Sequence, residues 1–402
     1  MLRGGWGVSY VHFNRAGGGN ILAINGPQVI NAVAVQGNAL APTFRTTQEG
    51  YPTGFTDPSK FDPLVANITY MPRDYHSASV QSWHVSVQRE IGSNMVVDVA
   101  YVGNRAEDML LFANYNQAAP NNAAGTLTLQ QRRPIQDWAD ITYAFNGGKS
   151  RYKALMVKYE WRLRGGVSVL SSTTLSETKD NGAGTLENQN GNAPSPQDFR
   201  NIDADFGLSN YHQPYNNTTS FVWSVPVGRG ERWMGNASRA LDLIVGGWQF
   251  AGISSFYSGE PVTFTYTPAA AALVSGITQD FRGQNIFRPN VTGDPYPAKA
   301  EQTITNWFNR DAVVVPTDIS QPFGNAARNT VRGPVFWQID FAMSKHFALT
   351  SSSDIEFRFE AFNLLNRTNF RPPNGNRSAG AFGTITSTYD PRQLQLGFKL
   401  NF

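Results

Sequence analysis

The chain of 402 residues contains no cysteine, so disulfides and thiolate metal ligands are excluded. Charged residues make up only 16%, against about a quarter in average soluble domains. The formal net charge of +3 is small for this length and gives no indication of a nucleic-acid partner. Long apolar runs are missing too: a membrane-spanning helix needs about 18 or more apolar residues, and the nearest segment is AAAALV at 269–274.

Motifs of catalysis and of cofactor or metal binding are equally scarce. The segment NGGKS (146–150) has Tyr143 where a phosphate-binding loop requires its first glycine, and no helical pattern follows it. The histidines show no spacing typical of metal ligands, and no Gly-x-Ser-x-Gly segment is present. The aspartates of NIDADFG (201–207) lack the rest of a calcium loop, so we interpret this segment as a surface loop. We therefore expect no enzyme activity, no cofactor and no metal site.

The dominant pattern in the sequence is that of β-strands. Aromatic residues reach 12%, and apolar and polar residues alternate with the period of two that a strand requires. The alternation predicts ten strands, at residues 2–13, 80–91, 95–103, 152–163, 167–178, 217–225, 246–257, 335–347, 354–363 and 391–402.

The predicted strands have one apolar and one polar face. In 155–163, leucine, valine, tyrosine and tryptophan occupy every second position. In 355–361, Glu356, Arg358 and Glu360 form a charged ladder on the polar face. Such a ladder fits the wall of a water-filled lumen, and it fits the solvated face of a soluble sheet equally well. We take these three residues as candidate lumen-facing residues.

The segments between the predicted strands alternate in length. Some are short or of medium length: 92–94, 164–166, 226–245 and 348–353. Others are long and rich in Gly, Asn, Pro and Ser: 14–79, 104–151, 179–216, 258–334 and 364–390. Aromatic residues near strand ends suit interfacial girdles: Trp161, Trp223, Trp248, Phe256 and Trp337. The predicted fold is therefore an all-β, antiparallel transmembrane β-barrel meander with short periplasmic turns and long extracellular loops.

The last predicted strand ends in RQLQLGFKLNF (392–402) and alternates as regularly as a core strand. Its apolar face ends in Phe398, Leu400 and Phe402. Apolar residues at alternate positions before a terminal phenylalanine resemble the C-terminal signal of bacterial outer-membrane proteins. The resemblance implies recognition by the barrel assembly machinery. The alternative is an ordinary edge strand, which in a soluble protein would be an aggregation hazard.

The resemblance to a known family extends in order along most of the chain. The stretches that carry it are SWHVSVQREIGSNMVVDVAYVGNR (82–105), WSVPVGRGERW (223–233), GGWQFAGISSFYSGEPVTF (246–264), FGNAARNTVRGPVFWQIDFAMSKHF (323–347), FRFEAFNLLNRTNF (357–370) and FGTITSTYDPRQLQLGFKLNF (382–402). They resemble the barrel of TonB-dependent receptors, especially the Oar-like group that carries a carboxypeptidase-regulatory-like domain. Complete receptors resemble a plugged barrel of about 22 strands, whereas about ten strands and no plug are predicted here. We therefore expect residues 1–402 to form a partial barrel, the C-terminal part of a receptor, without signal peptide, regulatory-like domain or plug.

The resemblance implies energised uptake of a bulky ligand across the bacterial outer membrane. Its implied partners are outer-membrane lipid, the barrel assembly machinery and a TonB-type energy transducer that acts through the missing N-terminal part. The ligand stays open between siderophore, oligosaccharide and peptide, and no nucleic acid is expected. Two alternatives remain at this point: a passive porin-like or structural outer-membrane barrel, and a soluble β-sandwich that binds glycans.

Overall fold

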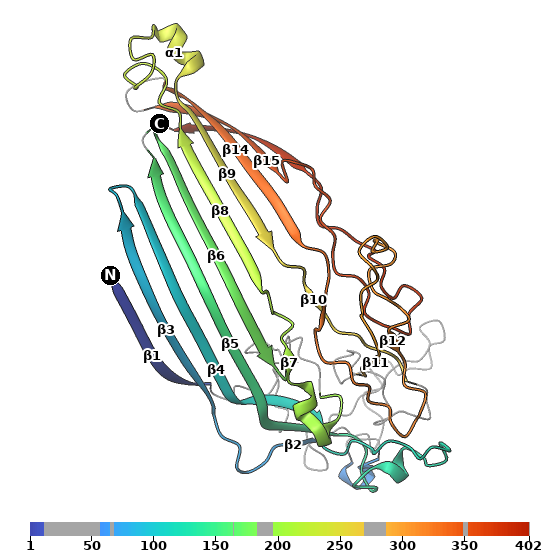
Figure 1. The fold of residues 1–402 in the computed structure, drawn as a ribbon. Coiled ribbons are helices and arrows are strands. Elements are labelled where there is room, and N and C mark those ends of the chain that lie inside the picture. The colour runs from blue at the N-terminus through green and yellow to red at the C-terminus, as the bar shows by residue number, and fades with distance from the viewer. Residues whose placement is uncertain are drawn as a thin grey trace, which may run out of the picture.

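The structure is a computed structural model that describes residues 1–11, 57–64, 68–163, 165–182, 196–268, 287–348 and 353–401. Ten long strands form one antiparallel sheet, in which each pairs with the next long strand of the chain (Figure 1). They are β1 (Leu2–Val11), β3 (Ala78–Ile91), β4 (Met95–Asn114), β5 (Ile141–Leu163), β6 (Val167–Asp180), β8 (Tyr215–Ser224), β9 (Trp248–Tyr257), β14 (Phe336–Ala348), β15 (Asp354–Phe362) and β16 (Gln393–Asn401). The ten predicted strands and their antiparallel meander are confirmed.

The sheet is open. Its order runs from β1 to β16, and these two end strands do not pair with each other in the part of the chain that the structure describes. The ribbon nevertheless forms a tall wall of tilted strands (Figure 1). The wall is therefore consistent with a partial barrel.

The two ends of this wall carry different connections (Figure 1). At one end, β5 and β6 are joined by a tight turn in which Gly165 and Gly166 have φ of 98° and 82°, values that favour glycine because it has no Cβ. The same end carries α1 (Arg239–Val245), which the sequence predicts only as part of the turn 226–245. None of the helices in the described ranges is long and apolar enough to cross a bilayer. The described parts of the long loops lie at the opposite end (Figure 1).

β4 and β5 are longer than predicted. Residues 104–114 and 141–151 belong to these strands, so the prediction of a loop there is wrong. The register shifts beside Asp108, which has a φ of 58°. Beyond this bulge, three consecutive residues of β4 (111–113) are buried. The bulge and the burial of both strand faces remove the period of two on which the prediction depended.

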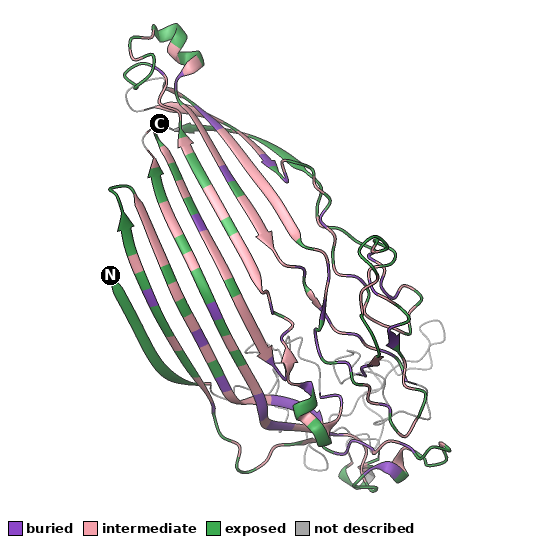
Figure 2. Cartoon of the chain, viewed as in Figure 1, coloured by how far each residue is buried: buried purple, intermediate pink, exposed green. Residues whose placement is uncertain are grey.

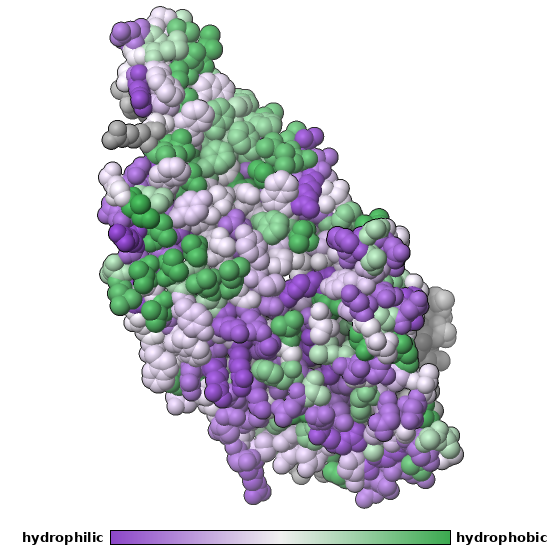
Figure 3. Space-filling model, viewed as in Figure 1, coloured by the Kyte–Doolittle hydropathy of each residue, from purple (hydrophilic) through white to green (hydrophobic). Residues whose placement is uncertain are grey.

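One face of the wall is apolar and exposed. Leu155 of β5 lies between Tyr101 of β4 and Leu175 of β6, and the three are 42%, 47% and 48% exposed. Figure 3 shows hydrophobic side chains gathered over the half of the wall nearest α1 and hydrophilic ones over the half nearest the long loops. We call the face with these apolar rows the outer face, because exposed apolar rows suit contact with lipid.

A few polar side chains also lie on the outer face, and they bond to one another. Asn217 Nδ2 donates to Thr173 Oγ1 at 2.8 Å, and the hydroxyls of Ser171 and Thr219 lie 2.7 Å apart. Polar groups in hydrocarbon need internal partners because no water is present to supply them. The polar side chains on β6 and β8 are therefore compatible with a lipid-facing surface.

The long loops fold into a compact layer, which we call the cap and define as the described residues of 57–77, 115–140, 181–214, 258–335 and 363–392. Its short elements are η3 (Pro58–Lys60), β2 (Ile68–Tyr70), η4 (Gln130–Arg132), η5 (Phe199–Asp205), β7 (Gly207–Leu208), β10 (Pro261–Val262), β11 (Asn290–Val291), β12 (Val313–Val314) and β13 (Val331–Arg332). β10 pairs with β13 and β11 with β12.

The cap has an apolar core of its own. One cluster consists of Val262, Phe264, Phe308, Val313, Val331 and Phe382. The rings of Phe264 and Phe308 meet edge to face, with 5.0 Å between their centroids. Figure 2 shows buried residues concentrated in and next to the loops, with few along the upper strands. The cap is thus packed like a soluble domain, whereas the wall is one sheet thick.

Candidate functional site: inner face and cap

The three candidate lumen-facing residues share the face of β15 opposite the outer face, which we call the inner face. Glu356 lies across from Lys399 of β16, and Arg358 Nη2 lies 2.9 Å from Glu360 Oε1. Phe357, between them, points to the outer face, where its ring lies 5.1 Å from that of Phe398. The alternation along β15 thus places the three charges on one face, and their place in a lumen stays a prediction.

The inner face is polar well beyond β15. One cross-strand row runs from β3 to β14 and contains only polar side chains: Gln88, Asp98, Lys158, Ser172, Thr218, Ser255 and Gln338. Opposite charges lie next to each other in this row, since Asp98 is the cross-strand partner of Lys158. Such pairs stabilise a sheet modestly. The row gives the inner face a continuous hydrophilic surface.

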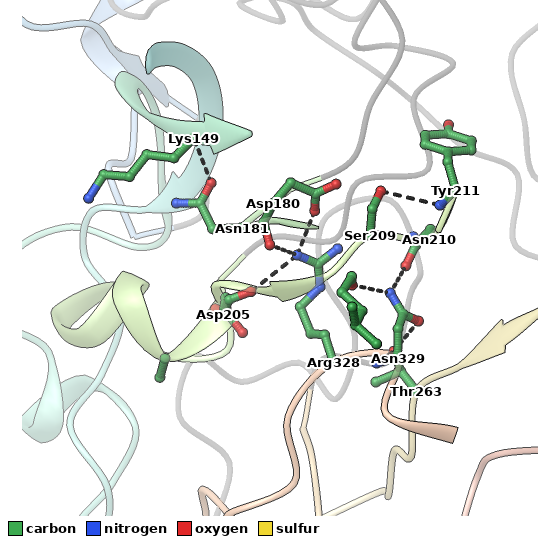
Figure 4. Close-up of polar contacts among 12 residues, drawn as sticks. Lys149, Asp180, Asn181, Asp205, Ser209, Asn210, Tyr211, Thr263, Arg328 and Asn329 are labelled. Atoms are coloured by element: carbon green, nitrogen blue, oxygen red, sulfur yellow. Dashed lines mark hydrogen bonds and ion pairs between the residues drawn. The ribbon is translucent and has the colours of Figure 1, made fainter. Parts of the chain in front are cut away.

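At the end of β6, one buried arginine joins the wall to the cap (Figure 4). Arg328 Nη1 donates to the carbonyl and carboxylate oxygens of Asp180, both at 2.9 Å, and to the carbonyl of Asp205 at 3.2 Å. The side chains of Arg328 and Asp180 are 3% and 7% exposed. Charges this deeply buried require a partner, because desolvation penalises an unpaired ion by several kcal/mol.

A second buried ion pair involves the segment NIDADFG, for which the prediction of a surface loop is only half right. Asp203 is exposed and pairs with Lys149 at 3.2 Å. Asp205 is buried and forms an ion pair with Nη1 of Arg288. The Nε of the same arginine donates a hydrogen bond to the Ala326 carbonyl at 2.8 Å. Arg288 and Arg328 come from the same long loop, so the pairs fix it over η5. The sequence carries no signal for these contacts, because the partners lie far apart along the chain.

Asn329 extends this junction to the first part of the same loop (Figure 4). Its φ of 56° lies in the left-handed region, which asparagine tolerates better than most residues. Its Nδ2 donates to the Leu208 carbonyl and to Asn210 Oδ1, both at 2.7 Å. Its backbone N–H donates to Thr263 Oγ1, which in turn donates to Asn329 Oδ1. The side chain is therefore fully used in holding the loops together.

Aromatic rings attach η5 to the lengthened part of β5. Tyr143 stacks on Phe145 with 4.6 Å between centroids and on Tyr70 of β2 at 5.3 Å. Phe199 of η5 meets Phe145 edge to face at 5.8 Å. These rings and the buried ion pairs form a closely packed surface at the loop end of the wall.

Two partly or fully buried titratable groups of the cap, Tyr266 and His212, are shifted toward their neutral forms. Burial raises the pKa of Tyr266 to about 12, and its hydroxyl donates to the Pro322 carbonyl. Burial lowers the pKa of His212, and nearby Arg332 lowers it further. The described residues contain no group of three potential metal ligands. What the cap offers to a ligand is therefore a fixed arrangement of amides, aromatic rings and paired charges.

Two of the three predicted assembly-signal residues lie on β16. Phe398 and Leu400 share its outer face and are 78% and 57% exposed. β16 pairs with β15 on one side and has no second neighbour among the described strands. Phe402 lies outside the described residues. Their role in assembly stays a prediction.

Residues 1–395 match the profile of the family described as outer membrane beta barrel domain. The chain belongs to this family. It is therefore a protein of the bacterial outer membrane, and the soluble β-sandwich alternative is wrong. No curated protein sequence matches the chain.

Solved structures similar to this chain are outer-membrane transporters at low identity. The transporter YddB from Escherichia coli has 12% identity and a TM-score of 0.43, over 84% of this chain and 35% of its own. The ferripyoverdine receptor of Pseudomonas aeruginosa has 10% identity and a TM-score of 0.38, over 82% and 28%. The FrpB iron transporter from Neisseria meningitidis has 11% identity and a TM-score of 0.38, over 83% and 32%. The chain spans about a third of their length.

Proposed function

We propose that this outer-membrane barrel domain is part of a TonB-dependent receptor that takes up a bulky ligand by energised transport. In this proposal residues 1–402 form the C-terminal part of the barrel, and the N-terminal part supplies the plug. The barrel binds and conducts its ligand and performs no covalent chemistry on it. On the basis of the sequence resemblance, the proposal assigns the receptor to the Oar-like subgroup.

The observation that carries the proposal is the open sheet with a polar inner face. Unpaired strand edges in hydrocarbon leave N–H and C=O groups unsatisfied, at several kcal/mol each. In the proposal, further strands pair with β1 and β16 and close the barrel around the polar row. A barrel larger than ten strands encloses a wide lumen, which fits a bulky ligand and requires a plug to keep the membrane sealed.

The cap supplies the second argument. Loops at the extracellular end of such barrels are long, and loops positioned by a rigid scaffold commonly carry binding. Here the loops are fixed by buried ion pairs and by an apolar core of their own. A fixed cap suits selective capture of a scarce ligand better than free diffusion through an open pore. Siderophore, oligosaccharide and peptide all remain candidate ligand classes.

Three partners follow from the proposal. A TonB-type energy transducer acts through the N-terminal part, and the barrel assembly machinery reads the last strand, with Phe398, Leu400 and Phe402 as its signal. Outer-membrane lipid covers the outer face. Glu356, Arg358 and Glu360 line the lumen, where they meet the plug or the ligand.

The test compares the native strain with two deletions, one of the full-length receptor gene and one of the TonB-type transducer gene. Each strain is grown with panels of iron chelates, oligosaccharides and peptides as the limiting nutrient. The proposal predicts that both deletions abolish use of the same compound. Use that survives loss of the transducer but not loss of the receptor would show a passive barrel.

The passive porin-like alternative makes an opposite prediction for conductance. The full-length protein, purified and inserted into a planar lipid bilayer, is expected to show little steady ionic current because its plug fills the lumen. A large steady current through the untreated protein would favour the porin-like alternative.

A further inference from the structure

Three cations form a row across the outer face of β4, β5 and β6. Arg105 is the direct cross-strand partner of Arg151, and Arg151 is the direct partner of Lys179. The adjacent row on the side of α1 adds Lys153, which lies across from Glu177. Like charges directly opposite each other destabilise a sheet. A row of this kind therefore needs an anion.

Carboxylates of the chain neutralise only part of this charge. Glu107 Oε1 lies 2.6 Å from Arg105 Nε. Glu177 is shared by Lys153 at 2.5 Å and Lys179 at 2.7 Å.

Arg151 has no carboxylate partner among the described residues. Its guanidinium lies 5.5 Å from the centre of the Phe206 ring, a contact that leaves its positive charge unneutralised. Four cations thus face two carboxylates, and two positive charges are left without a counter-ion.

The four cations and Glu177 line one cleft with a volume of about 500 Å³. The cleft also contains Trp83 and Tyr101. The indole of Trp83 packs directly against Gly103, since a Cβ on this glycine would be 2.2 Å from the ring. The cleft therefore has a cationic side toward the cap and an aromatic side toward the apolar wall.

The cations lie where the apolar band ends. Along the outer face of β5 the side chains from Trp161 to Leu155 are apolar or aromatic, and the next two are Lys153 and Arg151. From Trp161 to Arg151 the strand rises about 33 Å at about 3.3 Å per residue, or about 25 Å along the membrane normal at the usual tilt of such strands. An outer-membrane barrel has an apolar band about 25 Å tall. Arg151 therefore lies at the head-group level.

We propose that this cationic row binds the phosphorylated sugar head group of an outer-leaflet glycolipid. Its acyl chains then lie along Tyr101, Leu155 and Leu175. A phosphate monoester carries about −1.5 to −2 charges, which matches the two unbalanced positive charges. The inference rests on the orientation in the proposed function, with the long loops outside the cell, and it does not depend on what the receptor transports.

The test uses the full-length receptor purified from outer membranes, freed of lipid and reconstituted into phosphatidylcholine vesicles. The probe is diphosphorylated lipid A with a dansyl label, and binding is read as energy transfer from tryptophan. The variant is Arg151→Gln with Lys153→Gln. The matched control is Lys158→Gln with Arg162→Gln, which removes the same charge from the inner face of the same strand. Folding of all three is checked by heat resistance on a semi-native gel.

We expect the outer-face variant to bind the probe about tenfold or more weakly, the loss typical of one charge-assisted hydrogen bond, with the control unchanged. Lipid A without phosphate should bind the wild type as weakly as the probe binds the variant. Equal binding by variant and wild type would overturn the proposal. So would equal energy transfer from tryptophan to dansyl-labelled phosphatidylglycerol, which would show a general anionic surface. Full displacement of the probe by free inorganic phosphate would also overturn it, because it would show a soluble-anion site.

Discussion

The wall and the cap keep their apolar side chains away from water in opposite ways. In the wall, apolar side chains such as Leu155 and Phe398 are exposed on one face of a single sheet, and lipid takes the place of a core. In the cap, Phe264 and Phe308 are buried, and so are the ion pairs of Arg328 and Arg288. The stability of the wall therefore depends on the surrounding lipid and on hydrogen bonds between strand backbones, whereas the stability of the cap depends on specific side-chain contacts. Single substitutions should affect the two regions differently.

The largest effect is expected in the cap. Replacing Arg328 by methionine leaves the Asp180 carboxylate buried without its partner, which costs about 3–5 kcal/mol for a broken buried pair. We expect protease added to intact cells to cut the cap much faster, while the wall keeps its resistance to heat on a semi-native gel. The control is Lys149→Met, which breaks an exposed pair worth about 1 kcal/mol or less. Equal cutting of both variants would show that the buried pair does not hold the cap.

A somewhat smaller effect is expected from a charge on the outer face of the wall. Val157→Arg places a cation in the middle of the apolar band, at a cost of about 2–4 kcal/mol near the bilayer midplane. Met156→Arg places the same charge on the inner face and should cost little. The urea concentration at the unfolding midpoint of the full-length protein in lipid vesicles measures both losses of stability. A larger loss for Met156→Arg would reverse the assignment of the two faces.

The end of the chain should affect assembly more than stability. Deleting Phe402 removes one apolar side chain, which is worth about 2 kcal/mol of burial. That is small against a hydrogen-bonded wall, so the protein that does fold should keep near-normal heat resistance. The folded amount in the outer membrane should fall, because recognition precedes folding. A normal folded yield with reduced heat resistance would show that Phe402 only packs.

The smallest effect concerns pH and one exposed contact between cap and wall. The hydrogen bond of His76 to the Asp74 carbonyl raises the pKa of His76 above 6.5, and the Asp108 carboxylate 3.2 Å away raises it further. Protonated His76 therefore stabilises this contact below its unfolded pKa, and the stabilisation is lost as pH rises through the folded pKa. Hydrogen-exchange protection at residues 71–77, corrected for the intrinsic base-catalysed exchange rate at each pH, should be greater at acid pH than at alkaline pH. With His76→Gln this difference should disappear, and its persistence would assign it to another group.

The sequence predicts the wall well and the cap poorly, for a physical reason. Each wall strand has one apolar and one polar face, so the period of two marks it, as in 155–163. The extension of β4 past Asp108 is buried on both faces, so it shows no period. β10 and β13 have two residues each, too few for any period. The pair of Arg328 and Asp180 joins residues 148 positions apart, and neither residue is marked as buried by its neighbours.

The candidate lumen residues could be placed on one face because alternation alone determines that. The cationic row could not be predicted, because it depends on the register between β4, β5 and β6. Arg105, Arg151 and Lys179 are ordinary surface residues when read along the chain. Only the cross-strand register places them side by side.

The central claim is that the outer face meets lipid and the inner face meets water. Because residues 1–402 contain no cysteine, single cysteines can be placed one at a time at positions 155–160 of β5. The full-length protein, with any cysteine of its N-terminal part replaced by serine, is used in outer membranes. Each single cysteine is labelled with a polar maleimide, and a parallel set with a fluorophore that brominated lipid quenches. We predict an alternating result: positions 155, 157 and 159 are quenched by lipid and resist the polar reagent, and positions 156, 158 and 160 do the opposite. Uniform labelling, or alternation with the opposite phase, would contradict the assignment of the two faces.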